Sequence, residues 1–411
     1  MAPRTVFITG ANRGIGLGTV EKLLENQEIE AVIAGARNLG ASKRTGNLAT
    51  STSATTIMLE KDPRQGKEVK VWTNRAAGES FLKFLNGVDV VAEYSEVEQV
   101  KVEKEKCVNW RKNEKVCNCK YPFYDNQNAG CKESVYYPSC GIKMKFGPTV
   151  IVTQWPRNDM MSDEIVQAFW KTLIVSNVKT ILVFIGDEER KGIEKIFPQN
   201  VAAMHVGPLM VSTDAVKSPG DSKETDQDRI DFVVEALDDT VFSSTCCKGN
   251  LYLFQSKRHE GPVSCRSLVE TIEEYTDRVD MNPPHNPERL SMISFEGRGR
   301  ACVALAVTMA ILELSHGRVP NIKDIVIHIR TQKPGAIANL EQYISIYVAT
   351  IHYIKKKMPL AAGSRYQAGD DGVFYDEIKE FMLKMSAILQ NSNEQCQYGK
   401  CGEFLIWFLS N

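Results

Sequence analysis

A glycine-containing loop that runs directly into a long apolar segment constrains this chain more than any other feature. Residues 294–300 read Ser-Phe-Glu-Gly-Arg-Gly-Arg, and the apolar run Val303–Leu312 follows. A loop of this kind, between a short strand at 290–293 and a helix N-terminus, presents backbone N–H groups and a positive dipole end that can hold a phosphate. The guanidinium of Arg300 can donate hydrogen bonds to two phosphate oxygens at once. The segment therefore predicts a strand, a phosphate loop and a helix.

Composition bounds the classes of protein to which the chain can belong. Its 411 residues suffice for two domains or for one large domain with appendages, and 43% of them are hydrophobic. A formal net charge of −1 gives no general attraction to nucleic acid or to a membrane surface. The apolar stretch Phe404–Leu409 is too short to span a bilayer, and no secretory signal precedes the first strand. We expect a cytoplasmic protein without a nucleic-acid partner or a membrane span.

The loop also carries a family resemblance. The spacing from Ser294 to Arg300 equals that of the Cys-x5-Arg signature of protein tyrosine phosphatases, with Ser294 at the position of the nucleophilic cysteine. The resemblance covers about residues 77–360 and implies an α/β fold, a twisted mixed sheet flanked by helices. It also rests on further segments that match the family in order and spacing: Ile151–Pro156, Phe169–Trp170, Val178–Val183, Ile322–Arg330, Gln332–Pro334, Glu341–Tyr343 and Tyr353–Ile354.

The resemblance weakens at the nucleophile. A loop and a helix dipole can lower a thiol pKa from about 8.5 to roughly 3.5–7.5, whereas a serine hydroxyl starts too high for this effect to ionise it. A serine nucleophile needs an adjacent base, and Ile293 occupies the position where the family usually has histidine. The resemblance therefore implies a degenerate phosphatase domain.

Two further positions that support turnover also differ from the family pattern. Arg258 falls at the position of the general-acid aspartate and cannot donate a proton at neutral pH, although His259 or Glu260 could substitute. Ala338 falls at the first of two glutamines that position the hydrolytic water. With the nucleophile, the acid and the first glutamine all replaced, we expect a catalytically inactive pseudophosphatase.

The phosphate-binding residues are better preserved. The resemblance assigns phosphate contacts to Gly297, Gly299 and Arg300, and it assigns phosphotyrosine recognition to Tyr121, as an aromatic wall, and to Gln342, the second glutamine. An ordinary surface position is the alternative for Tyr121. The expected partner is a tyrosine-phosphorylated protein or peptide, and a scaffold role is the alternative.

Other charged and nucleophilic residues near the loop qualify this expectation. The carboxylate of Glu296 would repel a bound dianion by about 4 kcal/mol at roughly 4 Å and an effective dielectric near 20, unless it points outward or Arg298 offsets it. A rival interpretation is an active phosphatase that uses Ser294 or a displaced cysteine such as Cys302. Because Cys302 lies beyond Arg300 on the helix, its thiol would miss an in-line approach to phosphorus.

The N-terminus carries a different motif. Gly10, Gly14 and Gly16 follow a β-like run and precede a helical pattern at Val20–Leu24, which resembles the dinucleotide loop of short-chain dehydrogenases. Residues 1–40 would form a partial Rossmann-like βαβ segment, and NAD(P) would be a cofactor only if this fragment were functional. Otherwise no cofactor is expected. An NAD(P)-dependent oxidoreductase and a wrongly joined gene fragment remain alternatives, although the Tyr-x3-Lys spacings at 353–357 and 375–379 lie too far downstream.

The remaining segments complete the predicted organisation. Residues 41–76 have the Ser, Thr, Gly and Ala content of a linker, and 361–411 form a tail with one amphipathic helix near Tyr375–Leu389. We expect Phe381, Met382 and Met385 of that helix to pack on the domain. No metal is expected, because the clustered cysteines lack a familiar zinc spacing: Cys107, Cys117, Cys119, Cys131 and Cys140.

Overall fold

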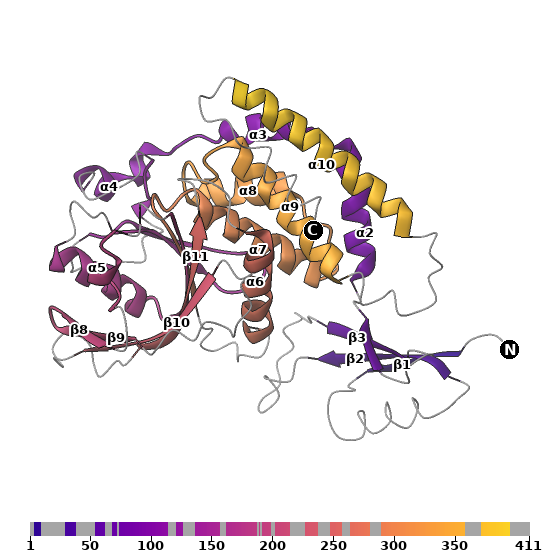
Figure 1. The fold of residues 1–411 in the computed structure, drawn as a ribbon, viewed down its shortest axis with the longest axis horizontal. Coiled ribbons are helices and arrows are strands. Elements are labelled where there is room, and N and C mark those ends of the chain that lie inside the picture. Colours follow the sequence, from indigo (N-terminus) through magenta and orange to yellow (C-terminus); the bar gives the residue numbers. More distant parts are fainter. Residues whose placement is uncertain are drawn as a thin grey trace.

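An eight-stranded mixed sheet lies at the centre of the computed structural model (Figure 1). The strand order is β5-β6-β12-β7-β11-β10-β9-β8, in which β6, β12, β7 and β11 run parallel and the other neighbours pair antiparallel. The expected α/β fold with a mixed sheet and flanking helices is confirmed. The strands are β5 Ser139–Ile142, β6 Val150–Gln154, β7 Val178–Gly186, β8 Ala202–Val206, β9 Leu209–Thr213, β10 Gln227–Ala236, β11 Cys247–Ser256 and β12 Arg289–Ser294.

The structure describes the following residues: 4–9, 29–37, 54–61, 68–71, 74–113, 121–125, 136–156, 162–186, 189, 191–198, 202–213, 227–236, 247–256, 264–279, 289–357 and 371–394.

Some of the helices begin at a residue whose side chain caps the first turn. The Asp89 side chain accepts from the N–H of Ala92, and the Asn321 side chain accepts from that of Asp324, which satisfies donors that a helix start leaves free. The α-helices are α2 Arg75–Phe84, α3 Val90–Glu98, α4 Val108–Lys112, α5 Asp163–Val175, α6 Cys265–Val279, α7 Arg300–Ser315, α8 Ile322–Gln332, α9 Leu340–Lys357 and α10 Asp371–Glu394. Short 3-10 turns are η2 Leu85–Gly87, η3 Lys104–Lys106 and η7 Ile193–Lys195.

Both faces of the sheet are covered, which explains why its central strands are almost continuously apolar. On β7, Leu182 and Phe184 lie in the larger core with α7, whereas Ile181, Val183 and Ile185 lie in a second core with α5. Successive strand residues point to opposite faces, so a strand covered on both sides needs apolar residues at every position.

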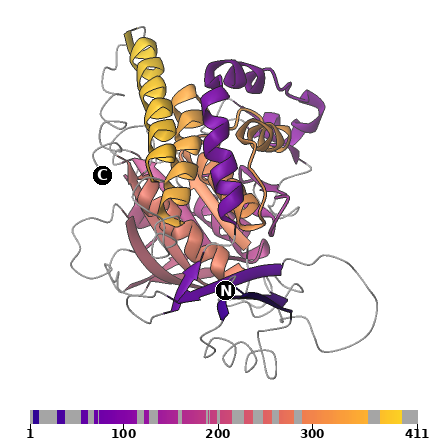
Figure 2. The same cartoon turned by 90° about the vertical axis from the view of Figure 1, so that its right-hand side faces the viewer.

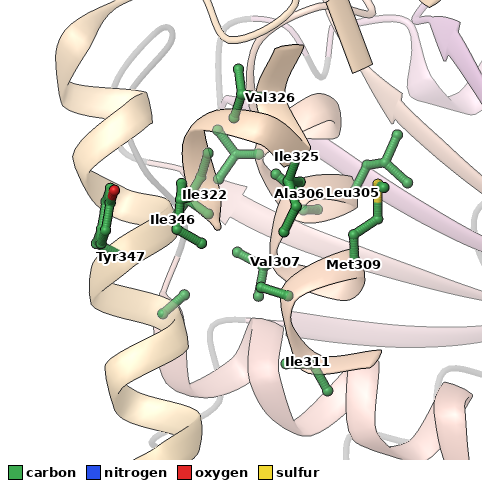
Figure 3. Packing of buried hydrophobic residues seen from close by; sticks show 14 of the residues in the cluster. Leu305, Ala306, Val307, Met309, Ile311, Ile322, Ile325, Val326, Ile346 and Tyr347 are labelled. Atoms are coloured by element: carbon green, nitrogen blue, oxygen red, sulfur yellow. The ribbon is translucent and has the colours of Figure 1, made fainter. Parts of the chain in front are cut away.

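Helix α7 occupies the middle of the larger core. Every residue from Arg300 to Leu314 is buried, as expected for a helix that is apolar all round. Figure 3 shows its side chains packed among those of α8 and α9, including Leu305, Ala306, Val307, Met309 and Ile311 of α7 beside Ile322, Ile325, Val326, Ile346 and Tyr347. The loop that precedes α7 is therefore attached to a rigid element.

The C-terminal helix α10 packs on the same core, where Figures 1 and 2 show it running along α2. Phe381, Met382 and Met385 are buried, as the amphipathic pattern predicted, and the helix is longer than expected at both ends. In the part of the chain that the structure describes, no helix is long and apolar enough to cross a membrane.

A separate four-stranded sheet is formed by the N-terminal residues. Strand β1 Arg4–Thr9 pairs in parallel with β2 Ile29–Arg37, the pairing that a βαβ segment implies. Strands β3 Ala54–Lys61 and β4 Glu68–Val71 add antiparallel neighbours within the stretch where composition predicted a linker. The β-branched residues of Ala54-Thr-Thr-Ile favour a strand, a signal that the Ser and Thr content obscured.

Candidate phosphate-binding site

The site is built at the turn between β12 and α7. Strand β12 ends at Ser294 and α7 begins at Arg300, so the predicted strand, loop and helix are confirmed. The Ser294 carbonyl accepts from the N–H groups of Gly297, at 3.0 Å, and Trp155, at 2.9 Å. The Gly299 carbonyl accepts from the N–H groups of Cys302 and Val303 at 2.9 and 3.0 Å, which starts the helix. These bonds fix both ends of the loop.

Glycine is required within this loop. Gly297 has φ 65°, and a Cβ there would lie 2.9 Å from the Thr153 carbonyl carbon and the Gln154 nitrogen. A side chain is therefore excluded both by the left-handed conformation and by the neighbouring strand. At Gly299 a Cβ would lie 2.8 Å from Nε2 of Gln342, so the loop and the α9 glutamine pack closely.

Arg300 closes the loop and is almost completely buried. Only 3% of its side chain is exposed, and its Nη2 donates to Oε2 of Glu189 at 2.5 Å. The same carboxylate oxygen accepts from the N–H of Gly186 at 2.6 Å. Nη1 of Arg300 has no hydrogen-bond partner among the described residues. Nη2 of Arg300 is thus held by Glu189, whereas Nη1 is available to donate to a ligand.

Glu189 was missed by the sequence interpretation. It follows β7 within the acidic run Asp187-Glu188-Glu189. The loops after parallel strands meet at one edge of a sheet, where ligands usually bind. Because β7 and β12 are adjacent and parallel, a carboxylate directly after β7 could have been expected near the loop after β12.

Ser294 lies at the start of the loop, and none of the described residues forms a hydrogen bond with its hydroxyl. Its side chain is buried, and Oγ has no hydrogen-bond partner among the described residues. Ile293, at the position of the family histidine, lies in the second core. Within the described part of the chain, no group accepts a proton from Ser294 through a hydrogen bond.

The glutamine loop contacts the phosphate loop from the other side. Oε1 of the buried Gln342 accepts from the N–H of Ala338 at 2.8 Å, and the N–H of Ile337 donates to the Arg298 carbonyl at 2.9 Å. Gln342 therefore lies beside the loop, and its assignment to phosphotyrosine recognition stays a prediction. Ala338 is brought to the same place, but a methyl group offers no hydrogen bond to a water molecule.

A buried arginine holds the glutamine loop in shape. Ile337 adopts φ 59°, which is unusual for a β-branched residue. Arg330 donates to the carbonyls of Ala336, Ile337 and Val97 at 2.7, 2.9 and 3.0 Å. These three bonds stabilise a conformation that the loop would otherwise avoid. The sequence contained this signal, since Arg330 belongs to the Arg-x-Gln-x-Pro turn.

Tyr121 also lies at the phosphate loop. The Arg298 guanidinium carbon lies 4.7 Å from the centroid of the Tyr121 ring, and Arg298 Nε is paired with a carboxylate oxygen of Glu296. A Cβ on Gly335 would lie 2.5 Å from the same ring. The pairing of Glu296 with Arg298 offsets the negative charge that the sequence placed near the anion site.

The remaining residues named from the sequence lie on α7, as expected for Cys302, or outside the described residues. Cys302 is buried on α7, and its Sγ donates to the Gly297 carbonyl at 3.8 Å, so it supports the loop. Arg258, His259 and Glu260 lie outside the described residues, as do the three N-terminal glycines. The dinucleotide interpretation of Gly10, Gly14 and Gly16 therefore stays a prediction. No group of three potential metal ligands occurs among the residues described.

The fold and the site together define an α/β domain in which a glycine-containing loop joins a strand of the mixed sheet to the N-terminus of a buried helix. A family model of protein-tyrosine phosphatases matches residues 82–352. A Caenorhabditis elegans protein named as a candidate tyrosine-protein phosphatase is 24% identical over 328 residues, covering 76% of this chain and 69% of the relative.

Solved structures show the same fold. The structure of PTPN18 in complex with HER2 phosphopeptides matches with a TM-score of 0.56 and 20% identity, over 68% of this chain and 99% of that one. The Trypanosoma cruzi tyrosine phosphatase TcPTP1 matches with a TM-score of 0.54 and 16% identity, over 65% and 92% of the two chains. The chain belongs to the protein-tyrosine phosphatase family, whose members need no cofactor.

Proposed function

We propose that this chain is a catalytically inactive member of its family that binds a tyrosine-phosphorylated protein or peptide. The proposal is supported by the geometry of the loop together with a serine that has no base among the residues the structure describes. Ser294 Oγ and Arg300 Nη1 are both buried and have no partner among the described residues. Two buried polar atoms without partners in one loop are costly unless a ligand satisfies them.

The loop supplies what a phosphate requires. Arg300 offers a charged donor in a buried position, and the loop lies at the N-terminus of α7, where the helix dipole favours an anion. The PTPN18 structure, in complex with HER2 phosphopeptides, supports phosphotyrosine as the ligand class. The loss of turnover is supported by Ser294 and Ala338, which cannot perform the thiolate and water-positioning steps of the family.

Binding is tested by calorimetric titration of the purified chain with a phosphotyrosine peptide and with its unphosphorylated twin. We expect binding only to the phosphorylated peptide. Arg300→Ala should weaken it about 10- to 100-fold, because a hydrogen bond to a charged group is lost. Arg318→Ala is the matched control, since Arg318 follows the other end of the same helix and is exposed. Equal binding of the two peptides would remove the binding proposal.

Turnover is tested separately with the same phosphopeptide and a phosphate-release assay. We expect no release by the wild type, because no described residue activates Ser294. We expect Ser294→Cys to remain slow, since Ala338 still lacks the amide that orients water. Phosphate release by the wild type at the rate of active family members would contradict the proposed inactivity.

A further inference from the structure

Arg298 is held in place by contacts on three sides. Its guanidinium lies over the Tyr121 ring, with 4.7 Å between Cζ and the ring centroid, and its Nε is paired with Glu296. Its carbonyl accepts from the N–H of Ile337 at 2.9 Å. Only 13% of the Arg298 side chain is exposed, and 22% of that of Glu296. The Arg298 side chain is therefore packed against both Tyr121 and Glu296.

We propose that Glu296, Arg298 and Tyr121 form a latch that admits a compact oxyanion to the phosphate loop but obstructs the aromatic ring of phosphotyrosine until Arg298 moves. The proposal rests on the proposed function of the same loop and adds its regulation. Arg298 is thereby a residue that determines ligand specificity.

The physical argument is competition for one aromatic ring. A cation engages an aromatic ring within about 6 Å of its centroid, and two aromatic rings pack with centroids roughly 4.5–7 Å apart. The guanidinium of Arg298, with Cζ 4.7 Å from the Tyr121 centroid, thus occupies one face of the ring within the distance at which the ring of an aryl phosphate would pack. An oxyanion without a ring needs only the loop and Arg300.

The charges of the latch also predict how it opens. The Glu296 carboxylate holds Arg298 from within the loop itself, two residues away. A bound phosphate dianion would repel Glu296 and attract Arg298. Binding of the phosphate group would thus weaken the Glu296–Arg298 pair and release the Tyr121 ring for a ligand that carries one.

The test compares a ligand with a ring and a ligand without one. Dissociation constants for phenyl phosphate and inorganic phosphate are measured by calorimetry on the wild type and on Arg298→Val. Removing Arg298 should improve the affinity for phenyl phosphate relative to phosphate by about tenfold, as expected when a cation–π contact is no longer displaced. Arg298→Lys keeps the charge but loses the planar guanidinium, so its affinity ratio should fall between those of the wild type and Arg298→Val. Arg318→Val is the matched arginine control and should leave the ratio unchanged.

A second readout needs no ligand. Nitration of Tyr121 by tetranitromethane, followed by mass spectrometry, should be faster in Arg298→Val than in the wild type, with equal melting temperatures as the folding control. An unchanged affinity ratio together with unchanged nitration would overturn the latch. Faster nitration without binding of either phosphate would show only that Arg298 covers the Tyr121 ring, and it would overturn the proposed ligand binding on which the latch rests.

Discussion

The guanidinium of Arg300 and the carboxylate of Glu189 form a buried ion pair, with 2.5 Å between Nη2 and Oε2 and side chains that are 3% and 5% exposed. The pair joins the start of α7 to the turn after β7, two elements more than 100 residues apart in the sequence. It therefore orients the arginine of the phosphate loop before any ligand arrives.

Glu189→Gln should show separately how this pair affects the free energy of unfolding and the affinity for phosphate. The variant leaves Arg300 buried without a counter-charge, so the free energy of unfolding should fall by about 3 kcal/mol. Its affinity for inorganic phosphate should rise, because the carboxylate no longer neutralises the arginine. Urea unfolding and calorimetry measure the two quantities. Glu194→Gln, at an exposed position of η7, should change neither, and weaker phosphate binding by Glu189→Gln would contradict the expectation.

Gly297→Ala tests whether the loop geometry is required. The φ of 65° and the backbone of Thr153 and Gln154 at about 2.9 Å leave no room for a methyl group. We expect a loss of about 1–3 kcal/mol in unfolding free energy and a loss of phosphate binding. Gly87→Ala is the control, since a Cβ at that position would meet no atom of the described residues within 4 Å. Equal stability of the two variants would show that the loop relaxes freely.

Much of the fold could be predicted from the sequence because it depends on burial. The continuous apolar runs of β7 and α7 predict that these elements are buried on all sides. The amphipathic pattern of α10 predicts that one face of this helix is buried. The strands β3 and β4 were missed, since Ser, Thr and Ala also occur in linkers. In these cases the local composition fits both a linker and a strand, and pairing with a neighbouring strand decides between them.

The site was predicted where residues are adjacent in sequence and missed where they meet only through the sheet. The loop from Ser294 to Arg300 carries its own signal. Glu189 reaches Arg300 because β7 and β12 are neighbours, which local sequence does not reveal. The cation–π contact of Arg298 with Tyr121 likewise depends on how a separate loop is placed, so it could only be found in the structure.

Stability should fall in alkaline solution because of buried thiols. Burial raises the pKa of Cys140 from 9.0 to about 12, so the folded state favours the protonated thiol. This contribution is fully present below pH 9 and is lost as the pH rises toward 12, at up to about 1.4 kcal/mol per pH unit. Urea unfolding at about pH 8 and about pH 10 measures the slope. Burial also raises the pKa of Cys265 to about 12, so Cys140→Ala should reduce the slope by the contribution of one thiol and leave the rest. The neighbouring control Ser139→Ala should keep the wild-type slope, and an equal slope in all three proteins would contradict the assignment.

Two adjacent residues of α10 test whether this helix is part of the folded domain. Met382 is fully buried and Leu383 is 53% exposed. Met382→Ala removes core contacts and should lower the free energy of unfolding by about 2–5 kcal/mol, whereas Leu383→Ala should change it by less than about 0.5 kcal/mol. Alanine favours a helix at both positions, so helix propensity does not explain a difference. Urea unfolding followed by circular dichroism measures both variants. If Met382→Ala is as stable as Leu383→Ala, α10 does not contribute to the core; a large difference means that α10 unfolds together with α2 and α9.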